Sequence, residues 1–249
     1  MKIKKILVSQ PKPKSEKSPY HCLADRYDLN IDFRKFIEVE GVTVKEFRKQ
    51  KVEVLDHSAI IFTSRTAIDH FFRICNEMRV SVPESMKYFC ISESVAYYLQ
   101  KYIVYRKRKI FYGNKQFIEL IEVMKKYKDE KFLIPLSEPH KKDIIKALDK
   151  SGYEYNKAVL YRTISSDLSD LSKFDYDMLV FFSPSGIKSL FENFPNFTQN
   201  GIKIASFGTS TAKAAKQAGL NLDVKAPTPE APSMTMAIEQ YINKKNGKN

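Results

Sequence analysis

Most of the candidate functional side chains in this sequence lie in short segments rich in Ser and Thr. Each follows a run of Ile, Val and Phe and precedes a stretch with helical spacing, so its hydroxyls fall where a helix begins. The first turn of a helix has free backbone N–H groups and a partial positive charge, which together attract anions. These segments therefore predict binding of anionic groups, although any single one also fits ordinary helix capping. The candidate residues are Thr63, Ser64, Arg65, Thr66, Ser92, Ser94, Ser183, Ser185, Gly186, Thr209, Ser210 and Thr211.

Other common kinds of catalytic site lack their motifs. With 8 glycines, the chain has neither GxGxxG nor GxxxxGK[ST], so we expect no nucleotide cofactor. It also has no GxSxG, which argues against a covalent hydrolase. The four histidines are scattered, and the three cysteines form no CxxC pair, so we expect no metal and reduced thiols. The function classes that remain are catalysis without a cofactor and ligand binding without catalysis.

The charge balance favours an anionic partner. Lys and Arg number 42 against 29 Asp and Glu, a net charge of +13. The basic run at 106–109 is flanked by Tyr105 and Phe111, but no RNA- or DNA-binding motif accompanies it, and such runs are usually solvated. No apolar run has the length of a membrane span, and the apolar stretch near the N-terminus is shorter than that of a signal peptide. We therefore expect a cytoplasmic protein that does not act on membranes.

Six runs rich in Ile, Val and Phe have the length of β-strands. Most are unbroken apolar runs, which is typical of parallel strands covered on both faces. They cover residues 5–9, 59–63, 88–91, 132–136, 178–182 and 203–207. Helical spacing is found between them at 66–79, 94–101, 114–127, 141–151, 185–194 and 210–218, with Gly152 and Gly219 as helix stops. This order predicts an α/β fold with doubly wound parallel sheets.

The sequence also contains two internal echoes at nearly the same offset. Residues 61–68 line up with 180–187, 119 positions further on, and residues 90–94 line up with 207–211 at an offset of 117. Short Ser/Thr turns recur in α/β proteins without duplication, but two echoes in the same order favour a duplicated unit.

Two similar domains of flavodoxin-like winding follow from this duplication. Residues 44–157 would form one, and residues 1–35 with 166–249 would form the other, discontinuous domain. The two crossings, 36–43 and 158–165, are extended and β-branched or aromatic, so we expect them to pair as a two-stranded β-ladder. A hinge and a cleft between the domains would result.

Four stretches resemble the uroporphyrinogen-III synthase family in order and spacing. They are IIFTSRTAIDHFF at 60–72, AVLYRT at 158–163, LVFFSPSGIKSLF at 179–191 and IASFGTSTAKAAKQAGL at 204–220, followed by a Pro/Thr segment from Ala226. The most specific parts are the Gly-x-[ST]-Thr-Ala turn at 208–212 and Tyr161 in the second crossing, 158–165. In their order and spacing, the stretches extend over nearly the whole chain.

The resemblance implies two α/β domains joined by a β-ladder and a cleft that works without a cofactor. It implies an enzyme that cyclises hydroxymethylbilane with inversion of ring D and loss of water, in haem biosynthesis. The substrate is a polycarboxylate, which suits the hydroxyl-rich turns and the positive charge. The resemblance nominates Tyr161 as the catalytic acid, while simple packing of Tyr161 on the ladder is the alternative.

Two turns depart from the family's pattern. Ser9-Gln10-Pro11 stands where the family usually has Thr-Arg-Pro, and Ser137-Glu138-Pro139 stands where an Arg-Gly pair is common.

The alternative function is that of a non-catalytic protein on the same scaffold, which binds a tetrapyrrole, or binds RNA through its basic surface. For the synthase we expect a small-molecule partner, no nucleic acid and a monomer.

Overall fold

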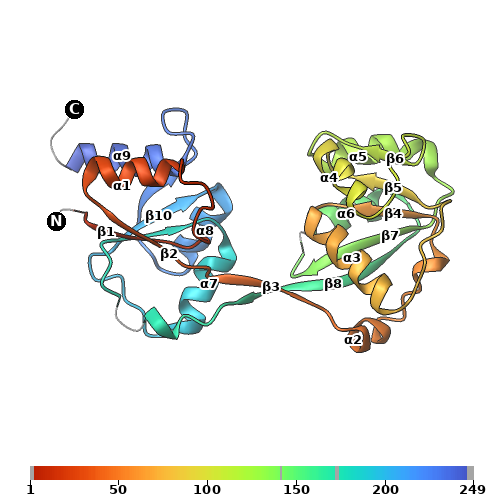
Figure 1. Ribbon diagram of the computed structural model, residues 1–249, viewed down its shortest axis with the longest axis horizontal. Helices are drawn as coiled ribbons and strands as arrows, with labels where there is room; N and C mark the ends of the chain where they lie inside the picture. Colours follow the sequence, from red (N-terminus) through yellow and green to blue (C-terminus); the bar gives the residue numbers. More distant parts are fainter. Residues whose placement is uncertain (1–2, 141, 172–173, 246–249) are drawn as a thin grey trace. The chain divides into compact units, whose positions relative to one another are not determined.

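The computed structural model describes residues 3–140, 142–171 and 174–245. The chain divides into two compact units (Figure 1). Unit 1 consists of Met1–Glu38 with Ile164–Asn249, and unit 2 consists of Val39–Thr163. Each unit has its own sheet, so the predicted class, a two-domain α/β protein with parallel sheets, is confirmed.

The sheet of unit 1 has five strands in the order β11-β10-β9-β1-β2, and all of its pairs are parallel. Its strands are β1 (Lys5–Val8), β2 (Asn30–Phe33), β9 (Met178–Phe181), β10 (Lys203–Phe207) and β11 (Leu222–Ala226). Its helices are α1 (Pro19–Tyr27), α7 (Pro184–Asn193), α8 (Thr209–Gln217) and α9 (Met234–Lys245), with a short 3-10 turn at Ser169–Leu171.

Helices cover both faces of this sheet, and this explains its unbroken apolar strands. Strand β9 is buried at every position. Helices α1 and α9 lie side by side on one face (Figure 1), where Leu23 and Ile238 pack with Ile6. Helices α7 and α8 cover the other face, where Leu190 and Ala215 pack with other buried residues.

Unit 2 contains most of a six-stranded sheet in the order β3-β8-β7-β4-β5-β6. Its strands are β3 (Ile37–Gly41), β4 (Ala59–Phe62), β5 (Lys87–Cys90), β6 (Ile110–Tyr112), β7 (Phe132–Glu138) and β8 (Tyr155–Ser165). Its helices are α2 (Val44–Lys49), α3 (Arg65–Glu77), α4 (Glu93–Tyr98), α5 (Phe117–Met124) and α6 (Lys142–Ser151). Three short 3-10 turns occur at Val54–Asp56, Leu99–Lys101 and Lys125–Tyr127.

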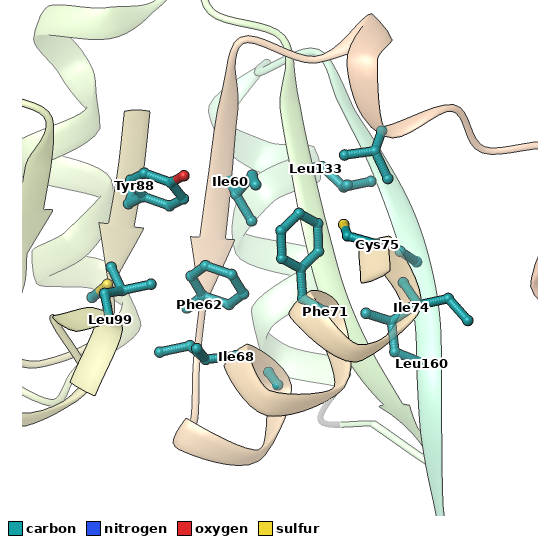
Figure 2. Close-up of a cluster of buried hydrophobic side chains, with 14 of the residues drawn as sticks. Ile60, Phe62, Ile68, Phe71, Ile74, Cys75, Tyr88, Leu99, Leu133 and Leu160 are labelled. Atoms are coloured by element: carbon teal, nitrogen blue, oxygen red, sulfur yellow. The ribbon is translucent and has the colours of Figure 1, made fainter. Parts of the chain in front are cut away.

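Aromatic rings fill the core on the α3 face of unit 2. Figure 2 shows Phe62 of β4 beside Phe71 of α3, with Tyr88 of β5 on its other side. The Phe62 and Phe71 rings meet edge to face with centroids 5.5 Å apart, and the Phe62 and Tyr88 rings are stacked at 6.3 Å. Helices α5 and α6 cover the opposite face, where Leu120 and Leu148 are fully buried.

The chain passes from unit 1 to unit 2 along β3 and returns along β8. These two strands are neighbours in the six-stranded sheet and lie together in Figure 1. Just beyond β3, the Val42 N–H donates to the Leu160 carbonyl at 2.9 Å. The pairing of outgoing and returning segments explains why both are rich in β-branched and aromatic residues.

Helix α2 begins with a capping box, and the Glu46 side chain of this box also contacts β8. The Glu46 carboxylate accepts from the Thr43 N–H at 3.0 Å, and the Thr43 hydroxyl accepts from the Glu46 N–H at 3.2 Å. The Arg162 guanidinium also donates to Glu46, at 2.8 Å. The backbone bond from Thr43, followed by the bond from Arg162, lowers the pKa of Glu46 from 4.5 to about 2.

Replacing Glu46 by Gln should make the stability of unit 2 less sensitive to acid. Because folding lowers the pKa of Glu46, its contribution is complete above pH 4.5 and is lost as the pH falls toward about 2. The wild-type melting temperature should therefore fall more than that of Glu46→Gln across this window. Thermal melts at closely spaced pH values measure the difference, and parallel curves for the two proteins would contradict it.

The strands and helices of the structure agree closely with the predicted bounds, and the structure contains further strands and helices that were not predicted. All six predicted strands are present, and their bounds differ by no more than two residues, as in β7 at Phe132–Glu138. The helix stops Gly152 and Gly219 have φ values of +71° and +81°. The helix predicted for 141–151 is α6, although residue 141 lies outside the described residues. The elements that the sequence patterns missed are α1, α2, α9, β2, β6 and β11.

Cys75 and Cys90 are buried and Cys22 is exposed, all as free thiols. Within the described ranges, none of the helices has the length and apolar character that crossing a membrane requires.

Candidate functional site

Ser64 occupies the start of helix α3 at the carboxyl end of β4. Its backbone is extended, with φ −160° and ψ 160°, and its hydroxyl accepts a hydrogen bond from the Ala67 N–H at 3.0 Å. Ser183 has the same place in unit 1, between β9 and α7, and accepts from the Gly186 N–H at 3.1 Å. The echo at an offset of 119 therefore corresponds to the same cap in both units.

Replacing either cap by Ala should destabilise the protein by about 1 kcal/mol, because a helix then begins with one more unpaired N–H. Ser64→Ala and Ser183→Ala should show similar losses in urea unfolding. Ser185→Ala is the matched control, since among the described residues the Ser185 hydroxyl has no recorded hydrogen bond. A loss with Ser185→Ala as large as with the caps would show that capping is not the cause.

Tyr161 of β8 lies next to the Ser64 cap. The two hydroxyl oxygens are 3.3 Å apart, and either group can be the donor. The Tyr161 ring stacks on the His70 ring of α3, with centroids 5.0 Å apart and planes 16° apart. Tyr161 is 9% exposed and belongs to the core cluster between this face of the sheet and α3. The structure thus brings the predicted acid and one predicted binding residue together inside unit 2.

His70 is the residue of this cluster that the sequence did not reveal. Its Nδ1 accepts from the Arg73 Nε at 3.3 Å, which leaves the ring neutral in this arrangement. Burial, and next the positive charge of Arg73, hold the pKa of His70 below its usual value. Arg73 in turn forms an ion pair with Glu77 at 2.8 Å. His70 and Tyr161 are far apart in sequence, so only the packing of α3 on β8 reveals the pair.

The other residues of this turn provide one free cation and two half-buried hydroxyls. Thr63 and Thr66 are partly exposed on either side of Ser64. The Arg65 guanidinium lies over the Tyr98 ring, 5.4 Å from its centroid. Among the described residues Arg65 has no acidic partner, so its charge is available to an anion.

Ser92 and Ser94 follow the neighbouring strand β5. Their hydroxyls are 3.1 Å apart, and Ser92 does not cap α4 through its side chain. Both residues line a surface pocket of about 520 Å³, together with Tyr112 and Lys115. Because β4 and β5 are adjacent and parallel, both turns of unit 2 lie at the same edge of its sheet.

The corresponding turn of unit 1 begins helix α8. Thr209 and Ser210 are exposed, whereas Thr211 is 1% exposed and faces the interior. Gly208 precedes the helix with φ +87°, so no side chain caps it. Gly186 and Ser185 lie in the first turn of α7, and the Ser9 N–H donates to the Val180 carbonyl at 2.9 Å beside them.

The side chains and backbone N–H groups of these turns provide hydrogen-bond donors and a positive charge for anions. Hydroxyls, free N–H groups and Arg65 can hold carboxylates, and the Tyr161 phenol can donate a proton or a hydrogen bond. Across residues 3–140, 142–171 and 174–245, no three His, Cys, Asp or Glu side chains gather in a way that could hold a metal ion.

A comparison with models of protein families identifies the family of the chain. The model of the family described as uroporphyrinogen-III synthase HemD matches residues 26–236, which is most of the chain. This chain belongs to the uroporphyrinogen-III synthase family. The resemblance read from the sequence, and the enzyme function in haem biosynthesis that it implied, are therefore confirmed.

Solved synthases share the fold of this family member. The uroporphyrinogen-III synthetase of Helicobacter pylori is 16% identical, with 97% of this chain and 100% of that chain covered and a TM-score of 0.63. A mutant uroporphyrinogen III synthase of the extremely thermophilic bacterium Thermus thermophilus is 15% identical, with coverage of 97% and 99% and a TM-score of 0.58. A search of curated protein sequences found no match.

One departure from the family pattern is compensated locally in this chain. Glu138 at the end of β7 lies beside Arg162 of β8, with Oε2 and Nε 3.7 Å apart. Arg162 also pairs with Glu46, so one guanidinium serves two carboxylates. The acid at position 138 therefore does not stand as an isolated negative charge near the predicted carboxylate-binding turns.

Proposed function

We propose that this protein is an active uroporphyrinogen-III synthase that cyclises hydroxymethylbilane with inversion of ring D and loss of water. The observation that carries the proposal is the Tyr161 hydroxyl beside the Ser64 cap, in a chain of this family. The enzyme would be a cyclising hydro-lyase that needs no cofactor. Its partner would be the linear tetrapyrrole, bound by a monomer in the cytoplasm without nucleic acid.

Substrate binding in this proposal depends on the hydroxyl-rich turns of both units. The cap residues Ser64 and Ser183, the exposed Thr209, and the free Arg65 each offer a donor to a carboxylate. We also assign Thr63, Thr66, Ser92, Ser94, Ser185, Gly186 and Ser210 to this role. Thr211 was a candidate too, but it is 1% exposed, so its hydroxyl does not face a ligand in this structure. A polycarboxylate held at many points is fixed in one conformation, which favours closure at the substituted end of ring D.

Tyr161 would act where the hydroxyl group leaves. The phenol donates a hydrogen bond or proton to the departing oxygen, water is lost, and a reactive azafulvene remains. Attack by the substituted carbon of ring D gives a spiro intermediate, which fragments and closes again with the ring inverted. Ser64 and His70 hold the phenol in place through the contact at 3.3 Å and the ring stacking.

Product analysis with freshly made hydroxymethylbilane tests the proposal. Without the enzyme this substrate closes to isomer I, so the expected result is isomer III well above the spontaneous isomer I. Isomer I alone would reject catalysis. Tight porphyrin binding without isomer III would instead support a non-catalytic tetrapyrrole-binding protein, and nucleic-acid binding that falls steeply with salt would support the RNA-binding alternative.

A further inference from the structure

Arg73 of helix α3 binds the backbone of both segments along which the chain passes between the units. Its Nη2 donates to the Val42 carbonyl at 2.7 Å and to the Leu160 carbonyl at 3.4 Å. Val42 directly follows β3, and Leu160 belongs to β8, so one side chain joins α3 to both segments. Leu160 directly precedes Tyr161 in the chain. Its hydrogen bond therefore restrains the backbone next to the phenol.

The same guanidinium holds the ring that packs on Tyr161. Its Nε donates to Nδ1 of His70 at 3.3 Å, three residues earlier on α3. The His70 ring stacks on the Tyr161 ring, with centroids 5.0 Å apart. Since Nδ1 accepts this hydrogen bond, the proton of the neutral ring lies on Nε2. Arg73 thus restrains Tyr161 in two ways, through the His70 ring and through the Leu160 carbonyl.

Gly41 at the end of β3 leaves the space that the Arg73 guanidinium occupies. A Cβ atom at position 41 would lie 2.9 Å from Cζ and Nη2 of Arg73 and 3.1 Å from its Nε. Contacts of 2.9 Å are too short for a Cβ atom, so a side chain here would displace the guanidinium from its partners. The φ of Gly41 is not positive, so the backbone itself would accept another residue. The close approach of Arg73 is what favours glycine.

We propose that Arg73 is a positioning residue for Tyr161, an inference that rests on the proposed function. It holds the phenol in the place where the hydroxyl group of the substrate leaves. Glu77 already pairs with Nη1 of Arg73 at 2.8 Å, so the charge of Arg73 is balanced within the protein. Its task is therefore the orientation of Tyr161 and not the binding of a substrate carboxylate. Loss of this restraint lowers kcat and leaves KM nearly unchanged, because a misplaced acid acts only in the transition state.

Arg73→Met tests this role, because methionine keeps an apolar stem and removes every donor. With hydroxymethylbilane, kcat should fall about tenfold while KM stays within about twofold. Arg106→Met is the matched control. Arg106 also forms an ion pair at 2.8 Å, with Glu84, and its side chain is 37% exposed against 31% for Arg73. It lies near the amino ends of β5 and β6, and its loss should leave kcat unchanged.

Gly41→Ala provides a second test that keeps the charge of Arg73. The guanidinium is the far end of a flexible side chain, so it can move while the fold is retained. This variant should lower kcat at least about threefold with little change in the melting temperature.

The tautomer of His70 gives a readout that does not depend on activity. NMR spectra that correlate ring nitrogens with ring protons should show an unprotonated Nδ1 in wild type and a mixture of tautomers in Arg73→Met and Gly41→Ala. The chain has four histidines, and the signals that disappear in His70→Phe identify this one.

Three results would overturn the positioning role while wild type still makes isomer III. They are a wild-type kcat in Arg73→Met, a rise in KM in place of the fall in kcat, and a fall in kcat without any change in the His70 signals. If Arg73→Met does not fold, the same criteria apply to Gly41→Ala. If wild type makes no isomer III, the proposed function fails and the positioning role fails with it.

Discussion

Tyr161→Phe should lower kcat by roughly 10²-fold or more while the melting temperature changes little. The substitution keeps the ring that packs on His70 and removes only the hydroxyl that lies 3.3 Å from the Ser64 hydroxyl. Loss of the hydroxyl should therefore affect the leaving step and not the fold. The measurement is kcat with hydroxymethylbilane, together with the ratio of isomer III to isomer I.

Tyr155→Phe is the control on the same strand. Tyr155 lies at the opposite end of β8, where its hydroxyl donates to Asp149 at 2.5 Å. This variant also loses a tyrosine hydroxyl and its hydrogen bond but should keep its kcat. Full activity of Tyr161→Phe with an unchanged isomer ratio would remove Tyr161 from the role of acid and leave substrate positioning as the mechanism.

Phe62→Ala should destabilise unit 2 by about 3–5 kcal/mol, as large-to-small changes of buried aromatic rings do. Phe62 is 0% exposed and packs against Phe71 and Tyr88 in the core of Figure 2, so its loss leaves a cavity among rings that cannot close it. The measurement is urea unfolding. Ile118→Ala is the control, because Ile118 is 58% exposed and its loss should change the stability by less than about 0.5 kcal/mol.

Cysteine reactivity reports the unfolding of unit 2 separately from that of unit 1. Cys75 and Cys90 are buried in the same core as Phe62. Burial raises the pKa of both thiols, that of Cys75 to about 12, so both remain protonated and slow to react. Cys22 lies exposed on α1 of unit 1. Phe62→Ala should expose the two slow thiols at lower urea than wild type, and identical curves would contradict the predicted core role of Phe62.

The buried strands were predictable from the sequence, because both faces of β4 and β9 are covered and all four residues of each are buried. Edge strand β2 escaped prediction because its positions are only exposed or half-buried, so it has no apolar run. Helix α1 carried a readable signal, since Ser18 caps it and Pro19 follows at its first position. That signal was short and was not matched by strong apolar spacing.

The site could be predicted only in part. The caps Ser64 and Ser183 followed from local patterns, because a cap depends on residues three positions apart. The proposed role of Tyr161 came from the family resemblance, and its stacking on His70 depends on how α3 packs on β8, which no local pattern encodes. The interior position of Thr211 likewise depends on the rotation of α8 about its axis. Tertiary packing decides these features.

The sequence of unit 1 is interrupted by that of unit 2, so the two parts of unit 1 are synthesised at different times. Strand β1 is synthesised early, but its neighbour β9 emerges only after all of unit 2 has been made. Unit 2 is contiguous and can fold while β1 still has an open edge, which is a risk for aggregation. Once β3 and β8 have paired, the long loop between β1 and β9 is effectively shortened, which lowers the entropy cost of closing the second sheet. Folding of unit 2 thus brings the two parts of unit 1 close together in the chain before β1 and β9 pair.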